Sequence, residues 1–238
     1  MVYLKNAPRQ DTLKDEHAWE HTAGTERAKR RDGRRAYYAV SDRLKKVKRL
    51  IRRGREKNTQ LINQLRPDGG RLLDVGCAYG RTLESLNTPK WVLHGIEPSP
   101  ALAKQANALC QQRGGHVVAD TAVGGLPQFE ADFFDVVVMR SFLEHEVNVG
   151  PVLRGVLRAL KPGGLTVIKV PNAGCWNAAL RGANWPGVRH PDHVNYFRPQ
   201  DLRQAVRQAG FDRITFPLLR RLPSSDNMWL VAHKAQAT

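Results

Sequence analysis

Beyond residue 70, short apolar runs alternate with longer amphipathic stretches. Four apolar runs have the length and composition of buried β-strands: 71–75, 91–96, 134–139 and 165–170. A stretch with helical periodicity follows each run, in the order 81–86, 101–112, 152–160 and 199–209. Strands that alternate with helices predict a doubly wound α/β fold, in which helices cover both faces of a mostly parallel sheet.

The C-terminal end of the chain has a different pattern. Two strand-like runs, Ile214–Leu218 and Met228–His233, are separated by a Pro-Ser-Ser-Asp-Asn turn sequence and by no helix. A connection this short joins antiparallel strands, because a parallel pair needs a crossover of about a dozen residues or more. We therefore predict a terminal antiparallel hairpin.

The N-terminal quarter of the chain differs from the rest. Between 36 and 53, apolar residues recur at helical spacing, with Lys and Arg at most of the positions around them. A second short apolar face follows at 61–65, and Gly69-Gly70 then interrupts the pattern. This predicts a basic, largely helical segment at 1–66 and a second domain at 67–238.

The charge of the chain is concentrated in that first segment. Of 238 residues, 38 are Lys or Arg and 22 are Asp or Glu, for a net charge of +16, and residues 1–66 alone carry +11. One interpretation is a solvated basic face. The other is attraction to an anionic surface, either RNA or acidic membrane lipid, or to a phosphorylated substrate.

Other features of composition bear on where the protein acts. No apolar run approaches the roughly 20 residues that a membrane-spanning helix needs, and the first 20 residues lack the apolar core of a secretion signal. Cys77, Cys110 and Cys175 are widely spaced, with no CxxC pair. We therefore expect reduced thiols in a cytoplasmic protein, peripheral at the membrane if the basic segment binds lipid.

The sequence Asp74-Val75-Gly76-Cys77-Ala78-Tyr79-Gly80 follows the first predicted strand and opens a helix. It therefore falls at the carboxyl end of a strand, where open α/β sheets bind ligands. Gly76 and Gly80 allow a tight turn and a close approach of the backbone to a ligand. The helix start favours an anionic group, and Asp74 can accept a hydrogen bond from an ammonium group.

A second acidic side chain, Glu97, ends the next strand, 23 residues beyond Asp74. A carboxylate at this place can accept two hydrogen bonds from a ribose diol. The alternative is a dinucleotide-binding domain. The spacing Gly76-x-Ala78-x-x-Arg81 argues against it, because the third glycine of Gly-x-Gly-x-x-Gly is missing.

From about residue 71 onward, this combination resembles the class I S-adenosylmethionine (SAM)-dependent methyltransferases. The resemblance implies a seven-stranded sheet, with Ala78 in place of the middle glycine of the first motif, a change expected to cost little room. It places Glu97 at the ribose, Pro98 beside the adenine and Asp120-Thr121 in the adenine loop. Leu143-Glu144-His145 and Leu160-Lys161-Pro162-Gly163-Gly164 resemble later family motifs. The candidate cofactor-binding residues are Asp74, Gly76, Cys77, Ala78, Gly80, Glu97, Pro98, Asp120, Thr121 and Arg140.

The segment from Trp176 to Phe197 is rich in aromatic residues and histidine, and it resembles a tract of bacterial methyltransferases acting on small molecules, quinones or sugars. In such an enzyme the segment would cover the methyl donor. The candidate substrate-binding residues are Trp176, Trp185 and Tyr196. The alternative for the tryptophans is that they form the core of a lid.

Methyl transfer from a sulfonium needs alignment of the acceptor and, in some cases, removal of its proton. Imidazole suits that task because its ordinary pKa lies near neutral pH. The candidates are His145, His190 and His193, although His145 can equally be a polar residue at a helix start. His190 and His193 lack a Cys/His cluster or an HExxH motif nearby in the sequence, so we predict no metal site.

Three hypotheses follow for function. The first is O-methylation of a small-molecule, glycan or lipid-linked acceptor. The second is an RNA methyltransferase that uses the basic segment as an electrostatic arm. The third is a non-catalytic protein that has kept the SAM fold to bind nucleic acid or a partner.

Overall fold

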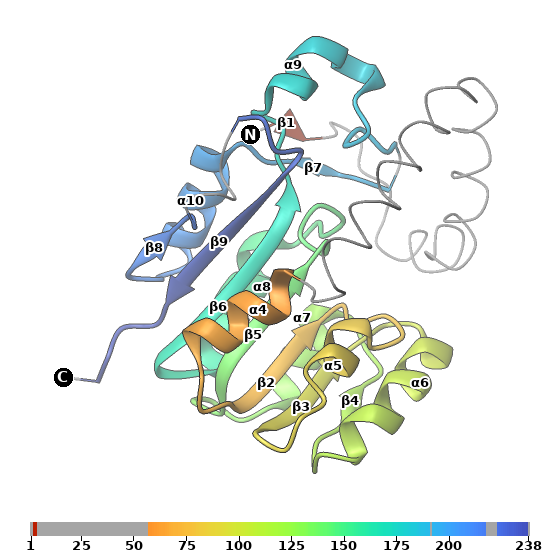
Figure 1. The fold of residues 1–238 in the computed structure, drawn as a ribbon, viewed down its shortest axis with the longest axis vertical. Helices are drawn as coiled ribbons and strands as arrows, with labels where there is room; N and C mark the ends of the chain where they lie inside the picture. The colour runs from red at the N-terminus through yellow and green to blue at the C-terminus, as the bar shows by residue number, and fades with distance from the viewer. Residues whose placement is uncertain (1, 4–56, 191, 218–222, 238) are drawn as a thin grey trace.

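The computed structural model describes residues 2–3, 57–190, 192–217 and 223–237 (Figure 1). The basic helix predicted at 36–53 lies outside these residues. The predicted boundary between residues 66 and 67 therefore stays a prediction.

A seven-stranded sheet forms the centre of the molecule (Figure 1), with the order β4-β3-β2-β5-β6-β9-β8. The strands β2 to β6 are parallel, and β9 runs antiparallel to both β6 and β8. The doubly wound sheet and the terminal hairpin predicted from the sequence are thereby confirmed. The strands are β2 (Gly70–Val75), β3 (Trp91–Ile96), β4 (Val117–Val118), β5 (Phe134–Arg140), β6 (Leu160–Pro171), β8 (Ile214–Thr215) and β9 (Asn227–His233).

Helices cover both faces of the sheet because successive strand residues point to opposite sides. On β2, Leu72 packs into one buried cluster, whereas Leu73 and Val75 pack into the other. The first cluster includes α4 (Lys57–Leu65), α5 (Arg81–Ser85) and α6 (Pro100–Gln111). The second includes α7 (Ala122–Gly125), the short η1 (Leu126–Gln128), α8 (Val149–Ala159) and α10 (Pro199–Gln208).

Helix α4 is joined to the sheet by apolar contacts and by side-chain hydrogen bonds. Ile62 is fully buried, and the indole Nε1 of Trp229 on β9 donates to Asn58 Oδ1 at 2.5 Å. The indole Nε1 of Trp91 on β3 donates to Asn63 Oδ1 at 3.3 Å. Residues 57–65 are therefore part of the packed structure around the sheet.

The segment between β6 and α10 contains a short helix α9 (Trp176–Arg181), the turn η2 (Gly182–Asn184) and β7 (Asn195–Tyr196). Strand β7 pairs antiparallel with β1 (Val2–Tyr3), so the start of the chain lies beside this segment. None of the helices in the described ranges is long and apolar enough to cross a membrane.

His94 on β3 makes the stability of this fold depend on pH. The ring is 4% exposed, among Phe129, Phe133 and Phe134. The backbone N–H of His116 donates to Nδ1 at 3.4 Å, and Nε2 finds no partner among the described residues. Burial, followed by the positive charges of His116 and Arg71, lowers the pKa of His94 from 6.5 to about 4.

We therefore expect the free energy of unfolding to fall as the pH drops from about 6.5 toward 4, because the unfolded chain takes up this proton more readily. Chemical denaturation across this range should show a loss about 3 kcal/mol smaller in His94→Phe than in the wild type. His190→Phe, at an exposed position, is the control and should keep the wild-type slope. An unchanged slope in His94→Phe would assign the acid sensitivity to other groups.

Candidate cofactor and substrate site

The turn after β2 depends on two glycines. Gly76 has φ +71° and Gly80 has φ +87°, both in the left-handed region that favours glycine. A Cβ at Gly76 would lie 2.6 Å from Cδ2 of Phe142, and one at Gly80 would lie 2.9 Å from Cδ1 of Leu109 on α6. The turn can therefore follow this path only with glycine at both positions. Because α5 has five residues, its dipole is small, and the turn itself provides most of the local geometry.

Ala78 occupies the middle position of the same turn with φ +47°. The sequence argument expected an alanine there to cost little, judged by the room for one methyl group. The structure shows that the relevant cost is conformational, because a residue with a Cβ is strained in the left-handed region.

Cys77 lies between these residues but turns its side chain into the core. It is 4% exposed, and burial raises the pKa of its thiol above the ordinary value. Its backbone N–H donates to Ile96 O at 3.1 Å, and this bond joins the turn to the end of β3. Any cofactor contact from Cys77 would therefore come from its backbone.

The carboxylate of Glu97 lies at the end of β3 against the same turn. Its Oε2 accepts from the backbone N–H of Ala78 at 2.9 Å, and its Oε1 accepts from that of Ser99 at 3.0 Å. The side chain is 7% exposed, so these two donors fix its orientation. A carboxylate with two oriented acceptor oxygens suits a ribose diol. Pro98, the next residue, is exposed.

The remaining candidate cofactor residues lie at neighbouring strand ends. Asp74, 2% exposed, is paired in register with Gly95 on β3. Asp120 and Thr121 follow β4, where the hydroxyl of Thr121 caps α7 by accepting from Gly124 N at 3.2 Å. Asp120 Oδ1 accepts from Thr121 N at 2.6 Å. Arg140 is the last residue of β5.

The segment Ser141–Glu146 connects this cofactor side to the Trp176–Phe197 segment. At one end, the ring of Phe142 lies over Gly76. At the other, the backbone oxygen of Glu144 accepts from Val194 N at 2.8 Å and from Asn195 N at 3.1 Å. The side-chain amide of Asn195 also donates to Leu143 O at 3.0 Å and to Glu146 O at 2.7 Å.

These bonds bring two of the three candidate histidines together. The rings of His145 and His193 meet edge to face, with centroids 4.7 Å apart. His145 Nδ1 lies 2.8 Å from Asp192 O, and His193 Nδ1 lies 2.8 Å from Gly187 O. Because a carbonyl only accepts, each Nδ1 carries the proton and each Nε2 keeps a lone pair. His190 is exposed and belongs to neither contact.

Glu144 completes this group, and the sequence argument did not assign it a role. It is 2% exposed, its Oε2 has no hydrogen-bond partner among the described residues, and burial raises its pKa. One ligand atom from each of Glu144, His145 and His193 lies within 4.8 Å of the others. This spacing is compatible with proton transfer and with a bound metal ion, so the predicted absence of a metal stays a prediction. The signal in the sequence was the adjacency of Glu144 and His145.

The candidate substrate-binding residues fall into different environments. Trp185 is 3% exposed, and its Nε1 donates to Asp226 Oδ1 at 2.9 Å, so its indole is held inside the segment. Trp176 is 67% exposed on α9. Tyr196 lies beside His193, with centroids 6.5 Å apart, and burial raises the pKa of its hydroxyl.

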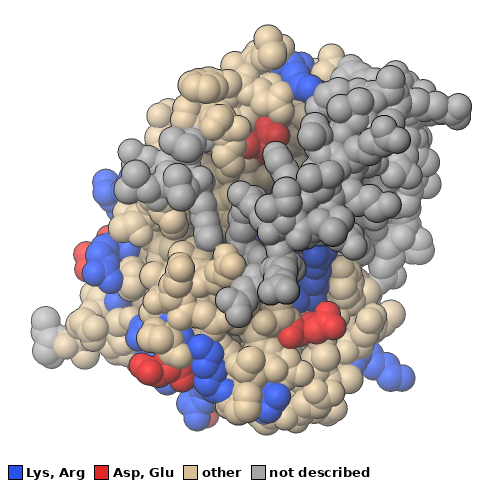
Figure 2. Space-filling view, viewed as in Figure 1, with Lys and Arg blue, Asp and Glu red and all other residues tan. Residues whose placement is uncertain are grey.

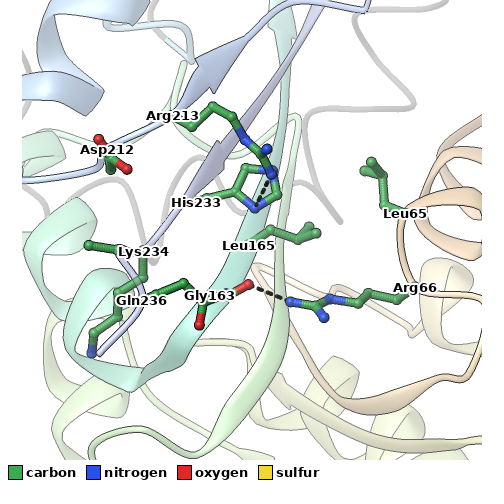
Figure 3. Close-up of a pocket in the computed structure, with 10 residues that line it drawn as sticks. Leu65, Arg66, Gly163, Leu165, Asp212, Arg213, His233, Lys234 and Gln236 are labelled. Atoms are coloured by element: carbon green, nitrogen blue, oxygen red, sulfur yellow. Dashed lines mark hydrogen bonds between the residues drawn. The ribbon is translucent and has the colours of Figure 1, made fainter. Parts of the chain in front are cut away.

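A cavity of about 400 Å³ lies elsewhere, at the amino end of β6 (Figure 3). Arg66, Arg213 and His233 are among its lining residues. Leu165, also in its wall, pairs with His233, whereas Pro171 at the other end of β6 pairs with Asn227. Six residues of strand separate the two ends, about 20 Å. This cavity is therefore distinct from the histidine pair.

A comparison with known proteins matches this geometry. The family model described as "Methyltransferase domain" matches residues 45–215. The chain belongs to this methyltransferase family. The position of Glu97 and the glycine turn at the ends of β3 and β2 fits its cofactor, S-adenosylmethionine.

Individual relatives agree with this assignment. The methyltransferase is 29% identical over 199 residues to a ubiquinone biosynthesis O-methyltransferase of Ralstonia nicotianae, covering 74% of this chain and 83% of that protein. It is also 29% identical to the protein of that name from Xanthomonas axonopodis pv. citri, covering 62% of this chain but 64% of the relative's length. A SAM-dependent methyltransferase of Archaeoglobus fulgidus has a similar fold, with TM-score 0.60 at 18% identity, covering 79% of this chain and 98% of that one.

Replacement of Glu97 tests its proposed contact with the ribose. In Glu97→Ala we expect the affinity for SAM, or for its demethylated product, to fall by about 1.5–3 kcal/mol, the range for hydrogen bonds to a charged group. Titration calorimetry measures this loss, with exposed Glu130→Ala as the matched control. Equal affinity in wild type and Glu97→Ala would remove Glu97 from the ribose site.

Ala78→Gly tests the strain in the turn. Glycine relieves the left-handed conformation but raises the entropy of the unfolded chain, so we expect a net gain of about 0.5–1 kcal/mol in the free energy of unfolding. Denaturant titration measures it. Ala106→Gly, inside α6, is the control and should destabilise the protein. A loss of stability in Ala78→Gly would show that Ala78 is not strained.

Proposed function

We propose that this methyltransferase methylates a hydroxyl oxygen of a small-molecule acceptor, with His145 as the general base. One observation carries the proposal: Asp192 O holds His145 in the tautomer with a free Nε2, beside His193 and Glu144. The names of the relatives support O-methylation of a small molecule. A glycan or lipid-linked acceptor falls within the same chemistry.

When bound, SAM supplies a methyl group on a sulfonium, which an acceptor oxygen takes in line. His145 accepts the hydroxyl proton at Nε2 as the oxygen forms its bond to carbon. Burial, and then the charge of His145, lowers the pKa of His193 to about 3. His193 therefore stays neutral beside a protonated His145, and the charge that develops there favours the ionised form of Glu144.

A fixed cover over the acceptor would exclude water from this step. Asp226 Oδ1, before β9, accepts from Trp185 Nε1 at 2.9 Å, from Asn177 Nδ2 at 2.8 Å and from Cys175 Sγ at 3.5 Å. Burial alone would raise the pKa of Asp226, but these three hydrogen bonds outweigh it and keep the pKa below its ordinary value. The ionised carboxylate therefore secures the cover at three points.

The two alternatives gain no support. The basic helix that the RNA hypothesis uses as an arm, predicted at 36–53, lies outside the described residues. On the face shown in Figure 2, the described Lys and Arg side chains are interspersed with Asp and Glu and form no single basic patch. Assignment to the methyltransferase family favours a catalytic role over binding alone.

Replacement of His145 tests the base. In His145→Asn, the amide can still donate to Asp192 O, but no basic nitrogen remains to accept the proton of the substrate hydroxyl. We expect kcat to fall by about 10²- to 10⁴-fold, the usual contribution of a general base, with SAM affinity nearly unchanged. The measurement is product formation with a catechol acceptor, beside calorimetric titration with SAM. His193→Asn and Tyr196→Phe should also lower turnover without loss of SAM affinity.

His190 is exposed and lies three residues before His193. His190→Asn is therefore the matched control and should keep wild-type turnover. Wild-type turnover in His145→Asn would contradict the proposed base, and a parallel collapse of SAM binding would assign the residue to the fold. The assay is repeated with EDTA, since loss of activity on chelation would assign Glu144, His145 and His193 to a metal ion.

A further inference from the structure

Lys169 is a cation at the substrate end of β6, opposite Arg140 in the sheet register. Its ammonium donates to Ser141 Oγ at 2.7 Å, while Ser141 N donates to Lys169 O at 2.8 Å. An ammonium has three protons to donate, and this is its single hydrogen bond within the described part of the chain. Ser141 is exposed, so this end of the site is open to an incoming molecule.

Lys169 forms no ion pair within the described residues. Burial lowers its pKa, Glu144 opposes that shift and Arg140 adds to it. Glu144 does not form an ion pair with it, and burial favours the neutral form of that carboxyl group. Asp192, which accepts from His145 through its backbone oxygen, has its carboxylate 3.7 Å from Arg189. Among the described residues, no carboxylate lies within ion-pairing distance of the Lys169 ammonium.

Lys161, at the other end of the same strand, has the carboxylate partner that Lys169 lacks among the described residues. Lys161 Nζ donates to both carboxylate oxygens of Asp135, at 2.8 and 2.9 Å. Both lysines are half-buried on β6, but only Lys161 has a carboxylate partner in the described residues. The ammonium of Lys169 lies beside Ser141, the first residue of the segment that carries His145, so we expect the acceptor to bind on this side.

We propose that Lys169 binds an anionic oxygen of the acceptor, namely a carboxylate carried by the same molecule whose hydroxyl is methylated. The inference rests on the proposed function and restricts the class of acceptor: the substrate is a hydroxy acid. A carboxylate takes the place of water on the free ammonium protons, and the resulting charge-assisted contact orients the hydroxyl toward His145. Lys169 is a specificity-determining residue, and His145 removes the proton.

The test compares two acceptors that differ in charge and little in shape, 3,4-dihydroxybenzoate and 3,4-dihydroxybenzamide. Their affinities for the full-length protein, saturated with demethylated SAM, are measured by titration calorimetry. We expect the carboxylate to bind about tenfold more tightly to the wild type, the effect of one hydrogen bond between charged groups. Lys169→Met should abolish this preference, Lys169→Arg should keep most of it, and Lys161→Met should leave it intact.

Equal affinities in the wild type, a preference that survives in Lys169→Met, or no binding of either compound would each overturn the proposal. If Lys169→Met weakens both compounds equally, the anionic oxygen is the ionised acceptor hydroxyl, and the carboxylate assignment fails. Thermal unfolding checks that Lys169→Met folds, and Lys169→Gln replaces it if it does not.

Methylation of both compounds is measured in parallel, so that the two proposals can fail separately. Charge preference without methylation would leave the anion site standing and contradict O-methyl transfer. Methylation without charge preference would support O-methyl transfer and contradict the anion site at Lys169.

Discussion

The backbone oxygen of Glu144 accepts two amide protons, from Val194 and Asn195, and the arrangement of the site depends on this contact. It joins the segment after β5 to a segment some fifty positions further along the chain. The side-chain amide of Asn195 reinforces it by bridging Leu143 O and Glu146 O. These bonds hold the two segments together, and the contact between the rings of His145 and His193 depends on them. A buried backbone oxygen needs a donor, so this contact is strongly determined.

The same contact places ionisable groups where water is scarce, and burial then sets their protonation. It raises the pKa of Glu144 and lowers those of His193 and Lys169. Each shift disfavours the charged form of the group, because burial is its largest cause. This protonation pattern is compatible with the proposed uptake of a proton and binding of an anionic oxygen of the substrate.

The terminal hairpin has a role at the site as well as in the sheet. The turn before β9 supplies Asp226, whose carboxylate secures the segment that carries Trp185, and the oxygen of Pro223 accepts from Trp176 N at 2.7 Å. Antiparallel pairing of β9 with β6 brings this turn to the edge of the sheet where the parallel strands end. The segment with Trp176 and Trp185 is thus attached to the central sheet through the last strand.

Local pattern determined the larger elements of this protein and pointed to the candidate cofactor residues. Apolar runs of strand length, helical periodicity and the glycine turn depend on neighbouring residues, so 91–96 was predicted as it occurs in β3, and Asp74, Gly76 and Glu97 could be named. The two-residue strand β4 is too short to produce such a pattern. Only the tertiary structure separated exposed His190 from the His145 and His193 pair, and buried Trp185 from exposed Trp176. It also showed that Lys169, a charged residue within an apolar run, has no carboxylate partner among the described residues. Burial and pairing across distant segments decide these roles, and neither is encoded in the spacing of residues along the chain.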